Sequence, residues 1–127
     1  MNILYIISSS SSGGGPINIG RLIEKSSHKC FVVIGKDDEY NYNFLERVSQ
    51  KIYNLPIRKI SIKNVFVLLS IIKKENIDII QSEGKIGGGY GRITAFILRK
   101  KSIHTFRGYY NYFRYPYNIL YYLFEFL

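Results

Sequence analysis

Three glycine-containing segments of this chain carry residue types that could bind phosphate or sugar groups. The first runs from Ser8 to Gly15 and ends in Gly13, Gly14 and Gly15, just before Pro16. Glycines in front of a helix let the backbone approach a phosphate closely, and the first N–H groups of the helix can bind it. No Lys-Ser or Lys-Thr pair follows, so the segment is not a Walker motif. It predicts either a phosphate or sugar contact or only a flexible turn.

The second segment follows an apolar run and places Glu83 and Lys85 on either side of Gly84. The two charged side chains could form a hydrogen-bonding pair for a hydroxylated acceptor. Alternatively, Glu83 could only cap the helix that follows. Four more glycines lie within residues 87–91. They would let that helix approach the sheet closely or admit a ligand to its backbone.

The third segment, Thr105 to Tyr110, combines Arg107 with Tyr109 and further tyrosines. The planar guanidinium of Arg107 could hold a phosphate bidentately. The tyrosines could stack on sugar rings, lie at a lipid headgroup interface, or simply pack beneath the next helix. His104 falls inside an apolar run and is expected to pack rather than react. Cys30 is expected to be an inert core residue.

Short, β-prone apolar runs predict the strands that position these segments. Three runs suit strands buried within a parallel sheet: Ile3–Ile7, Cys30–Ile34 and Ile77–Ile80. Ser102–Phe106 predicts one more strand. Ile57–Ile62 alternates apolar with polar or basic residues, which predicts an edge strand.

Helical patterns separate the predicted strands. The first three helices are predicted from Pro16 with Ile19, Leu22 and Ile23 inward, more weakly over Phe44–Lys51 after a loop at Lys36–Asn43, and from a cap at Asn64. A fourth follows a glycine-rich turn at Gly84–Gly91 and has Phe96 and Ile97 inward. The last begins at Pro116 and has an apolar face of Leu120, Leu123, Phe124 and Leu127. The alternation predicts an α/β fold with a mostly parallel sheet. Ligands bind at the carboxyl ends of such strands, where all three segments lie.

Composition limits the class of protein. The chain has 127 residues, 46% hydrophobic, and 18 Lys and Arg against 9 Asp and Glu give a net charge of +9. This length suits one domain, residues 1–127, and the charge indicates anionic partners. A single cysteine cannot form an internal disulfide or a four-cysteine zinc site, and no metal is expected. No helix gathers the basic residues on one face, so nucleic acid is the least favoured partner.

Several stretches together resemble the N-terminal half of a family 4 glycosyltransferase of the two-domain GT-B type. They follow the family's order and cover nearly the whole chain: Ile3–Ser8 with Gly13–Gly15, Ser27–Val33, Ile77–Ser82, Gly88–Arg92 and Ile103–Tyr109. The resemblance implies a Rossmann-like, three-layer domain. It also implies retaining transfer of a sugar from a nucleotide-sugar co-substrate, with no bound cofactor, to a glycan or lipid-linked acceptor.

The resemblance further implies roles for particular residues. Gly13, Gly14 and Gly15 would approach the donor phosphates, while an acceptor-binding set would comprise Glu83, Lys85, Arg107 and Tyr109. Polysaccharide biosynthesis at the inner face of the cytoplasmic membrane is the setting that the family implies. An anionic membrane surface would then contact basic residues such as Lys73, Lys74, Arg99, Lys100, Lys101 and Arg114. No export signal or stretch of ~20 apolar residues is present, which favours a cytoplasmic location.

Two departures from the family pattern affect these expectations. Glu83 and Arg107 stand near positions where family members often carry histidine, and arginine cannot accept a proton near neutral pH. A role of Arg107 would therefore be phosphate or carboxylate binding. The donor-binding C-terminal domain is also missing, so the chain could be a fragment, a truncated gene product or one subunit of a split enzyme with a C-terminal-domain partner chain. Alone, we expect it to transfer sugar poorly or not at all. The alternative is a catalytically dead sugar- or lipid-binding module of the same fold.

Overall fold

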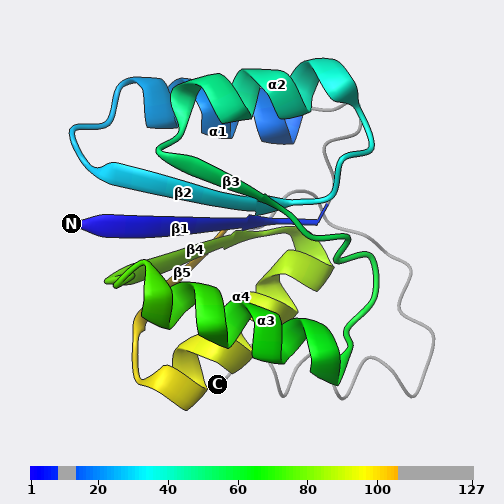
Figure 1. The fold of residues 1–127 in the computed structure, drawn as a ribbon, viewed down its shortest axis with the longest axis vertical. Helices are drawn as coiled ribbons and strands as arrows, with labels where there is room; N and C mark the ends of the chain where they lie inside the picture. Colours follow the sequence, from blue (N-terminus) through cyan, green and yellow to red (C-terminus); the bar gives the residue numbers. More distant parts are fainter. Residues whose placement is uncertain (9–13, 106–127) are drawn as a thin grey trace.

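Five parallel strands form one sheet at the centre of the computed structural model, which describes residues 1–8 and 14–105 (Figure 1). Every pair of neighbours is parallel, and the order is β3-β2-β1-β4-β5. The strands are β1 Asn2–Ile7, β2 Lys29–Ile34, β3 Lys51–Asn54, β4 Ile79–Glu83 and β5 Lys101–Thr105. The predicted α/β fold with a parallel sheet is confirmed.

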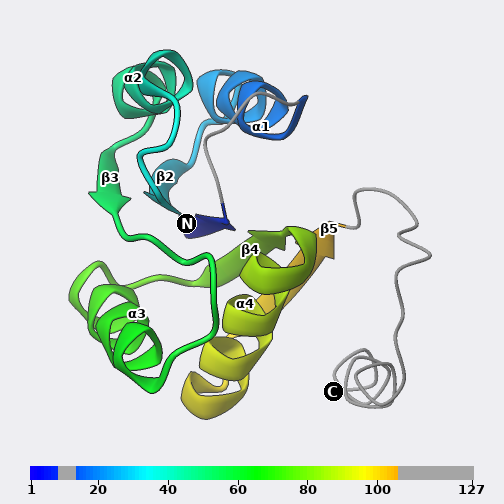
Figure 2. The same cartoon turned by 90° about the vertical axis from the view of Figure 1, so that its right-hand side faces the viewer.

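Within the part of the chain that the structure describes, four helices cover the sheet, two on each face. They are α1 Gly14–Glu24, α2 Glu39–Val48, α3 Ile62–Lys74 and α4 Gly84–Leu98. Figures 1 and 2 show α1 and α2 together on one face and α3 and α4 on the other. The result is the three-layer, Rossmann-like arrangement that the sequence predicted.

The central strand β1 is buried on both faces because its side chains alternate between two cores. Leu4 and Ile6 belong to the core beneath α3 and α4, whereas Tyr5 and Ile7 belong to the core beneath α1 and α2. All four are at most 4% exposed. Burial, with Cys30 nearby, raises the pKa of Tyr5 to about 12. This two-sided burial explains the continuous apolar run in the sequence.

The predicted edge strand at Ile57–Ile62 is wrong, because the edge strand in this part of the chain is β3, Lys51–Asn54, and Ile62 already begins α3. Ile57 is fully buried in the connecting loop and packs in the α3/α4 core. Its apolar character therefore reflects a loop residue that fills the core rather than strand alternation.

Two helices begin earlier in the chain than the sequence analysis predicted, each at a polar N-cap. The predicted loop at Lys36–Asn43 contains the start of α2, where the Asp38 side chain accepts a hydrogen bond from Asn41 N at 2.9 Å. Likewise, Ser61 rather than Asn64 caps α3, its Oγ accepting from Asn64 N at 3.2 Å. Both are ordinary N-caps, which satisfy a backbone donor that has no partner within the helix.

Three apolar side chains predicted to face inward are exposed: Leu22 at 52%, Phe96 at 76% and Ile97 at 51%. In α4 the glycines occupy the face against the sheet, so the large residues are turned outward. The final helix predicted from Pro116 lies outside the described residues.

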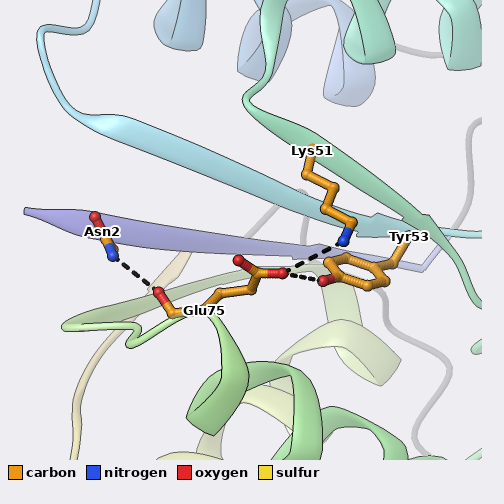
Figure 3. Close-up of polar contacts among 4 residues, drawn as sticks. All are labelled: Asn2, Lys51, Tyr53 and Glu75. Carbon is orange, nitrogen blue, oxygen red and sulfur yellow. Dashed lines mark hydrogen bonds and ion pairs between the residues drawn. The ribbon is translucent and has the colours of Figure 1, made fainter.

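A polar cluster joins the C-terminal end of α3 to β1 and β3 at the amino end of the sheet (Figure 3). The Tyr53 hydroxyl donates to the Glu75 carboxylate, and Lys51 Nζ lies 3.6 Å from the same oxygen. Asn2 Nδ2 donates to the backbone oxygen of Glu75 at 2.8 Å. These contacts fix the end of the sheet opposite to the one where ligands are expected.

Candidate functional site

The carboxyl ends of β1 and β4 mark the place where the chain changes faces of the sheet. After β1 the chain enters α1 on one face, and after β4 it enters α4 on the other (Figure 2). The two strands are neighbours and end level with each other, since Ile7 pairs with Glu83. In open parallel sheets this switch point is where a ligand crevice forms.

The amino end of α4 lies directly over the end of β1. Gly84 begins the helix at φ 69°, a left-handed conformation that strains any residue with a Cβ. A Cβ at Gly84 would lie 3.7 Å from Ser8 Oγ, and one at Gly87 would lie only 2.9 Å from the Ile6 carbonyl oxygen. These glycines therefore bring the helix backbone against the strand that forms one wall of the switch point.

Glu83 is the last residue of β4 and is only 5% exposed. It occupies the N-cap position of α4, but its side chain makes no capping hydrogen bond. The predicted capping role is therefore wrong. Because it pairs with Ile7 and alternates with Ser82, its side chain is on the α1 face of the sheet. A buried carboxylate thus lies at the end of a central strand.

Lys85 lies in the first turn of α4 and is exposed, two residues beyond the buried Glu83. The two side chains therefore differ sharply in environment. Their joint action on an acceptor hydroxyl stays a prediction.

The first glycine segment is shorter as a loop than predicted, because Gly14 and Gly15 already form the first turn of α1. Pro16 is in that turn, where its missing N–H is tolerated. The backbone N–H groups of Gly14 and Gly15 are accordingly among those without partners inside the helix. Gly13, Arg107 and Tyr109 lie outside the described residues, and their predicted roles stay predictions.

The glycine-rich segment predicted as a turn at Gly84–Gly91 is helical throughout. Close packing is the reason: a Cβ at Gly88 would lie 2.4 Å from His104 Cε1, and one at Gly91 would lie 2.6 Å from Ser82 Cβ. Of the two roles considered for these glycines, close approach to the sheet is the one observed. His104 is in turn 3.2 Å through Nδ1 from the buried Ser82 Oγ, so it packs as expected.

Tyr90, near the carboxyl edge of the sheet, is a contact residue that the sequence analysis missed. It is fully buried, and its hydroxyl donates to the Lys59 carbonyl while accepting from Ser61 N at 2.9 Å. Tyr90 thereby ties α4 to the loop between β3 and α3. A lone tyrosine among helical glycines was the available signal, since small neighbours leave one large side chain to fill the core.

An ion pair joins two further loops at the carboxyl edge of the sheet. Arg58, after β3, donates to the carboxylate of Asp37, after β2. Lys36 N donates to Asn54 Oδ1 at 3.2 Å between the same two loops. The pair is separated by 21 positions in sequence, so spacing gave no indication of it.

The arrangement offers backbone donors from two helix N-termini, α1 and α4, on either side of one buried carboxylate. Helix N-termini attract anions such as phosphate, and a carboxylate accepts hydrogen bonds from hydroxyl groups. Within residues 1–8 and 14–105, no group of three or more His, Cys, Asp or Glu side chains could hold a metal ion. The same residues contain no helix long and apolar enough to cross a membrane.

The fold matches one half of GT-B glycosyltransferases. The crystal structure of a glycosyltransferase from Rickettsia africae ESF-5 aligns with a TM-score of 0.68 and 17% identity over 94% of this chain. Acinetobacter baumannii MurG aligns with a TM-score of 0.64 and 12% identity over 85% of the chain. The alignments cover 32% and 36% of those proteins, so this chain spans about a third of their length. No family model and no curated protein matches the sequence.

Proposed function

We propose that this chain is the acceptor-side, N-terminal domain of a family 4 GT-B glycosyltransferase. The enzyme would move a sugar from a nucleotide-sugar to a glycan or lipid-linked acceptor, with retention of configuration. The observation that best supports this proposal is the sheet order β3-β2-β1-β4-β5, with two helices that begin with glycine at its switch point. The match to one half of two glycosyltransferase structures supports it.

The described residues suit different parts of this reaction. N–H groups of Gly14 and Gly15 would bind donor phosphate oxygens at the start of α1. The buried carboxylate of Glu83 would accept a hydrogen bond from the acceptor hydroxyl, and Lys85 would bind an anionic or hydroxyl group at the rim. Arg107 and Tyr109 would complete the acceptor side.

A second lobe would supply the remaining donor contacts. We therefore expect the 127-residue chain alone to bind ligand weakly and to transfer sugar poorly, and to become active with a C-terminal-domain partner chain. The alternative is a catalytically dead sugar- or lipid-binding module. Glu83 and Arg107 at the family's histidine positions favour that alternative.

The test is titration of the full chain with nucleotide-sugars and polyprenyl-phosphate sugars, followed by transfer assays with and without a C-terminal-domain chain. Transfer only by the pair supports the proposal. Ordinary turnover by the chain alone contradicts the need for a second lobe. Binding of glycan or lipid without transfer by any pair would favour the dead module.

Two substitutions locate the site within the active pair. Arg107→Ala should abolish transfer, and Glu83→Gln should lower kcat by roughly 100-fold if the carboxylate accepts the hydroxyl proton. Arg21→Ala, on the exposed surface of α1, is the matched control and should leave transfer unchanged. Wild-type rates in both site variants would rule out this assignment.

A further inference from the structure

An open groove of about 690 Å³ lies between the last turns of α4 and the start of β5. Ala95, Phe96 and Ile97 form its apolar lining, and Ser102 of β5 also lines it. Phe96 is 76% exposed and Ile97 is 51% exposed, although both belong to regular helix. Large apolar side chains gathered on one surface indicate a contact, and the described residues do not supply it.

The groove includes a part of the sheet that no described helix covers. Ser102 pairs with Ile80, whose side chain packs in the core beneath α3 and α4, so both side chains point to that face of the sheet. His104 is covered there by Gly88 of α4, but Ser102 is exposed. Parallel sheets are normally covered by helices on both faces. A further helix beside α4 would complete the layer over β5, an edge of the described sheet.

Residues 106–127 follow β5 in the chain and lie outside the described residues. The sequence predicts a helix from Pro116 whose apolar face comprises Leu120, Leu123, Phe124 and Leu127. Twelve residues of helix are ~18 Å long, close to the ~17 Å length of the five-residue strand β5. The connection, residues 106–115, can span up to ~33 Å, more than the ~10 Å that separates packed helices. The segment is therefore long enough to return along β5 and fill the groove.

The path of the chain favours this face of the sheet. α3 connects β3 to β4 and α4 connects β4 to β5, so both steps run toward the same edge, and both helices lie on one face (Figure 2). Because crossover connections keep a single hand, a helix that continues outward from β5 belongs on the same face. It would run parallel to α4, since both start from the carboxyl edge of the sheet.

Charge also matches between the groove and the segment. Arg99 and Lys100 line the groove, and residues 84–105 contain no Asp or Glu. Within residues 106–127, Glu125 is the only acidic residue. In a helix parallel to α4, Glu125 would lie level with Arg99 and Lys100, which follow α4. It is off the apolar face, where the long cationic side chains at the rim can reach it.

We infer that residues 116–127 dock as a helix in this α4–β5 groove, defined as Ala95, Phe96, Ile97, Arg99, Lys100 and Ser102. The apolar side of the segment packs against Phe96, Ile97 and the start of β5, and Glu125 pairs with Lys100 at the rim. The inference goes beyond the proposed function and does not depend on it, because its test involves no sugar transfer.

A segment of the same chain is favoured over other occupants because it is already tethered at the end of β5. A connection of about ten residues gives an effective concentration of the order of millimolar, so even a weak contact forms within the chain. A second copy, a partner chain or a bilayer would need an affinity of its own. Each of these occupants predicts a different result in the test.

The experiment measures how fast iodoacetamide alkylates a cysteine placed in the groove of the full chain. Ser102→Cys is made in a Cys30→Ala background, so that it supplies the only thiol. Each rate is divided by the rate of the same variant in urea, which removes differences in intrinsic reactivity. The docked segment should slow alkylation of Ser102→Cys at least about tenfold. Ser27→Cys, exposed between α1 and β2, is the matched control and should react nearly as fast as in urea.

Substitutions in the segment distinguish its two sides. Leu123→Ser/Phe124→Ser removes apolar side chains that face the groove, and should bring alkylation at position 102 to within about twofold of the rate in urea. Tyr122→Ser, on the opposite side of the predicted helix, should leave the protection in place. A cooperative urea transition in every variant shows that the domain still folds. Equal effects of the two changes would overturn the inference.

Charge reversal tests the direction of the helix. Glu125→Lys should lower the protection about two- to fivefold, and Lys100→Glu/Glu125→Lys should restore it. Glu24→Lys, at an exposed acid on α1, is the control and should not change the protection. Protection that Glu125→Lys leaves unchanged, or that the double exchange does not restore, would contradict a helix parallel to α4.

The other occupants are separated by the conditions under which protection appears. Protection that is independent of protein concentration and needs no addition supports docking within the chain. Protection that disappears on dilution would assign the groove to a second copy. Protection that appears only with phosphatidylglycerol vesicles, or only with a C-terminal-domain chain, would assign it to lipid or to that partner. Each of these three results, like alkylation of Ser102→Cys as fast as in urea, overturns the inference.

Discussion

Gly87 of α4 meets the backbone of β1 at Ile6. A Cβ on Gly87 would lie 2.9 Å from the Ile6 carbonyl oxygen, closer than real side chains approach. Because the obstacle is backbone at the centre of the sheet, it cannot move aside as a side chain would. This contact sets how closely the amino end of α4 approaches the switch point.

Gly87→Ala is therefore expected to destabilise the fold, although alanine is the better helix former. Overpacking costs about 1–3 kcal/mol, against a gain in helix propensity of about 1 kcal/mol. A net loss of up to about 2 kcal/mol in the free energy of unfolding should appear in urea titrations. In the control Gly89→Ala, the Cβ meets only the end of the Ile60 side chain, which can move, so we expect a gain of about 0.5–1 kcal/mol. A stabilised Gly87→Ala protein would show that this contact is loose.

The Gly88 and His104 pair predicts a coupled effect. A Cβ at Gly88 would lie 2.4 Å from His104 Cε1, so Gly88→Ala alone should cost about 1–3 kcal/mol. In the double variant Gly88→Ala/His104→Ala the imidazole ring is absent, so the new Cβ at position 88 has nothing to clash with there. The double variant should be more stable than the sum of the two single effects by at least about 0.5 kcal/mol, measured by a urea double-mutant cycle. Strict additivity would mean that α4 shifts as a whole to accommodate the methyl group.

Removing the Tyr90 hydroxyl should loosen the loop before α3. Tyr90→Phe keeps the ring but leaves the Lys59 carbonyl and Ser61 N–H without their buried partner, at a cost of about 1–3 kcal/mol. Amide exchange at Ser61 should quicken more than exchange in β1. Tyr40→Phe, at an exposed tyrosine, should change neither. Unchanged exchange at Ser61 in Tyr90→Phe would mean that the loop is held by other contacts.

The Glu75 cluster predicts a pH dependence of stability (Figure 3). The Tyr53 hydroxyl that donates to Glu75, together with Lys51, lowers the pKa of this carboxyl below its ordinary 4.5. Its contribution to the free energy of unfolding is therefore complete above pH 4.5 and is lost as the pH falls through the lowered pKa. The loss should be modest, because the cluster is only partly buried and Lys51 is exposed to solvent.

Urea midpoints across the acid range would check this dependence. Glu75→Gln should lose stability near neutral pH and show a flatter decline in acid than the wild type. Tyr53→Phe should move the decline toward higher pH, since the carboxylate loses its hydroxyl donor. Glu24→Gln, at an exposed acid on α1, is the control. Identical acid profiles for wild type and Glu75→Gln would refute the prediction.

The local sequence correctly predicted the strands that are buried on both faces of the sheet. β1 and β2 were placed correctly because each is a continuous apolar run, buried on both faces. The predicted start of α2 lies too far along the chain, because few residues of this helix are buried and one of these is the polar Asn41. Its start depended on the Asp38 cap, which a count of apolar residues does not register.

The candidate site was only partly visible in the sequence. Strand order brings the ends of β1 and β4 together, so Glu83 and the glycines that begin α1, Gly14 and Gly15, were correctly assigned to the carboxyl edge. The contacts of Tyr90 with Lys59 and of Arg58 with Asp37 were missed. Each joins residues more than 20 positions apart, and a single sequence contains no measure of such distances.

The sequence by itself determined the α/β class, because hydrophobic period and run length are local properties of the chain. Tertiary structure alone decided what the glycines of residues 84–91 do. In isolation they favour a turn, since glycine loses more backbone entropy in a helix than any other residue. In the structure, Ile6, His104 and Ser82 leave no room for a Cβ on the glycines that face them. Close packing on the sheet therefore stabilises this glycine-rich segment as a helix. That packing turns Phe96 outward, where it is exposed.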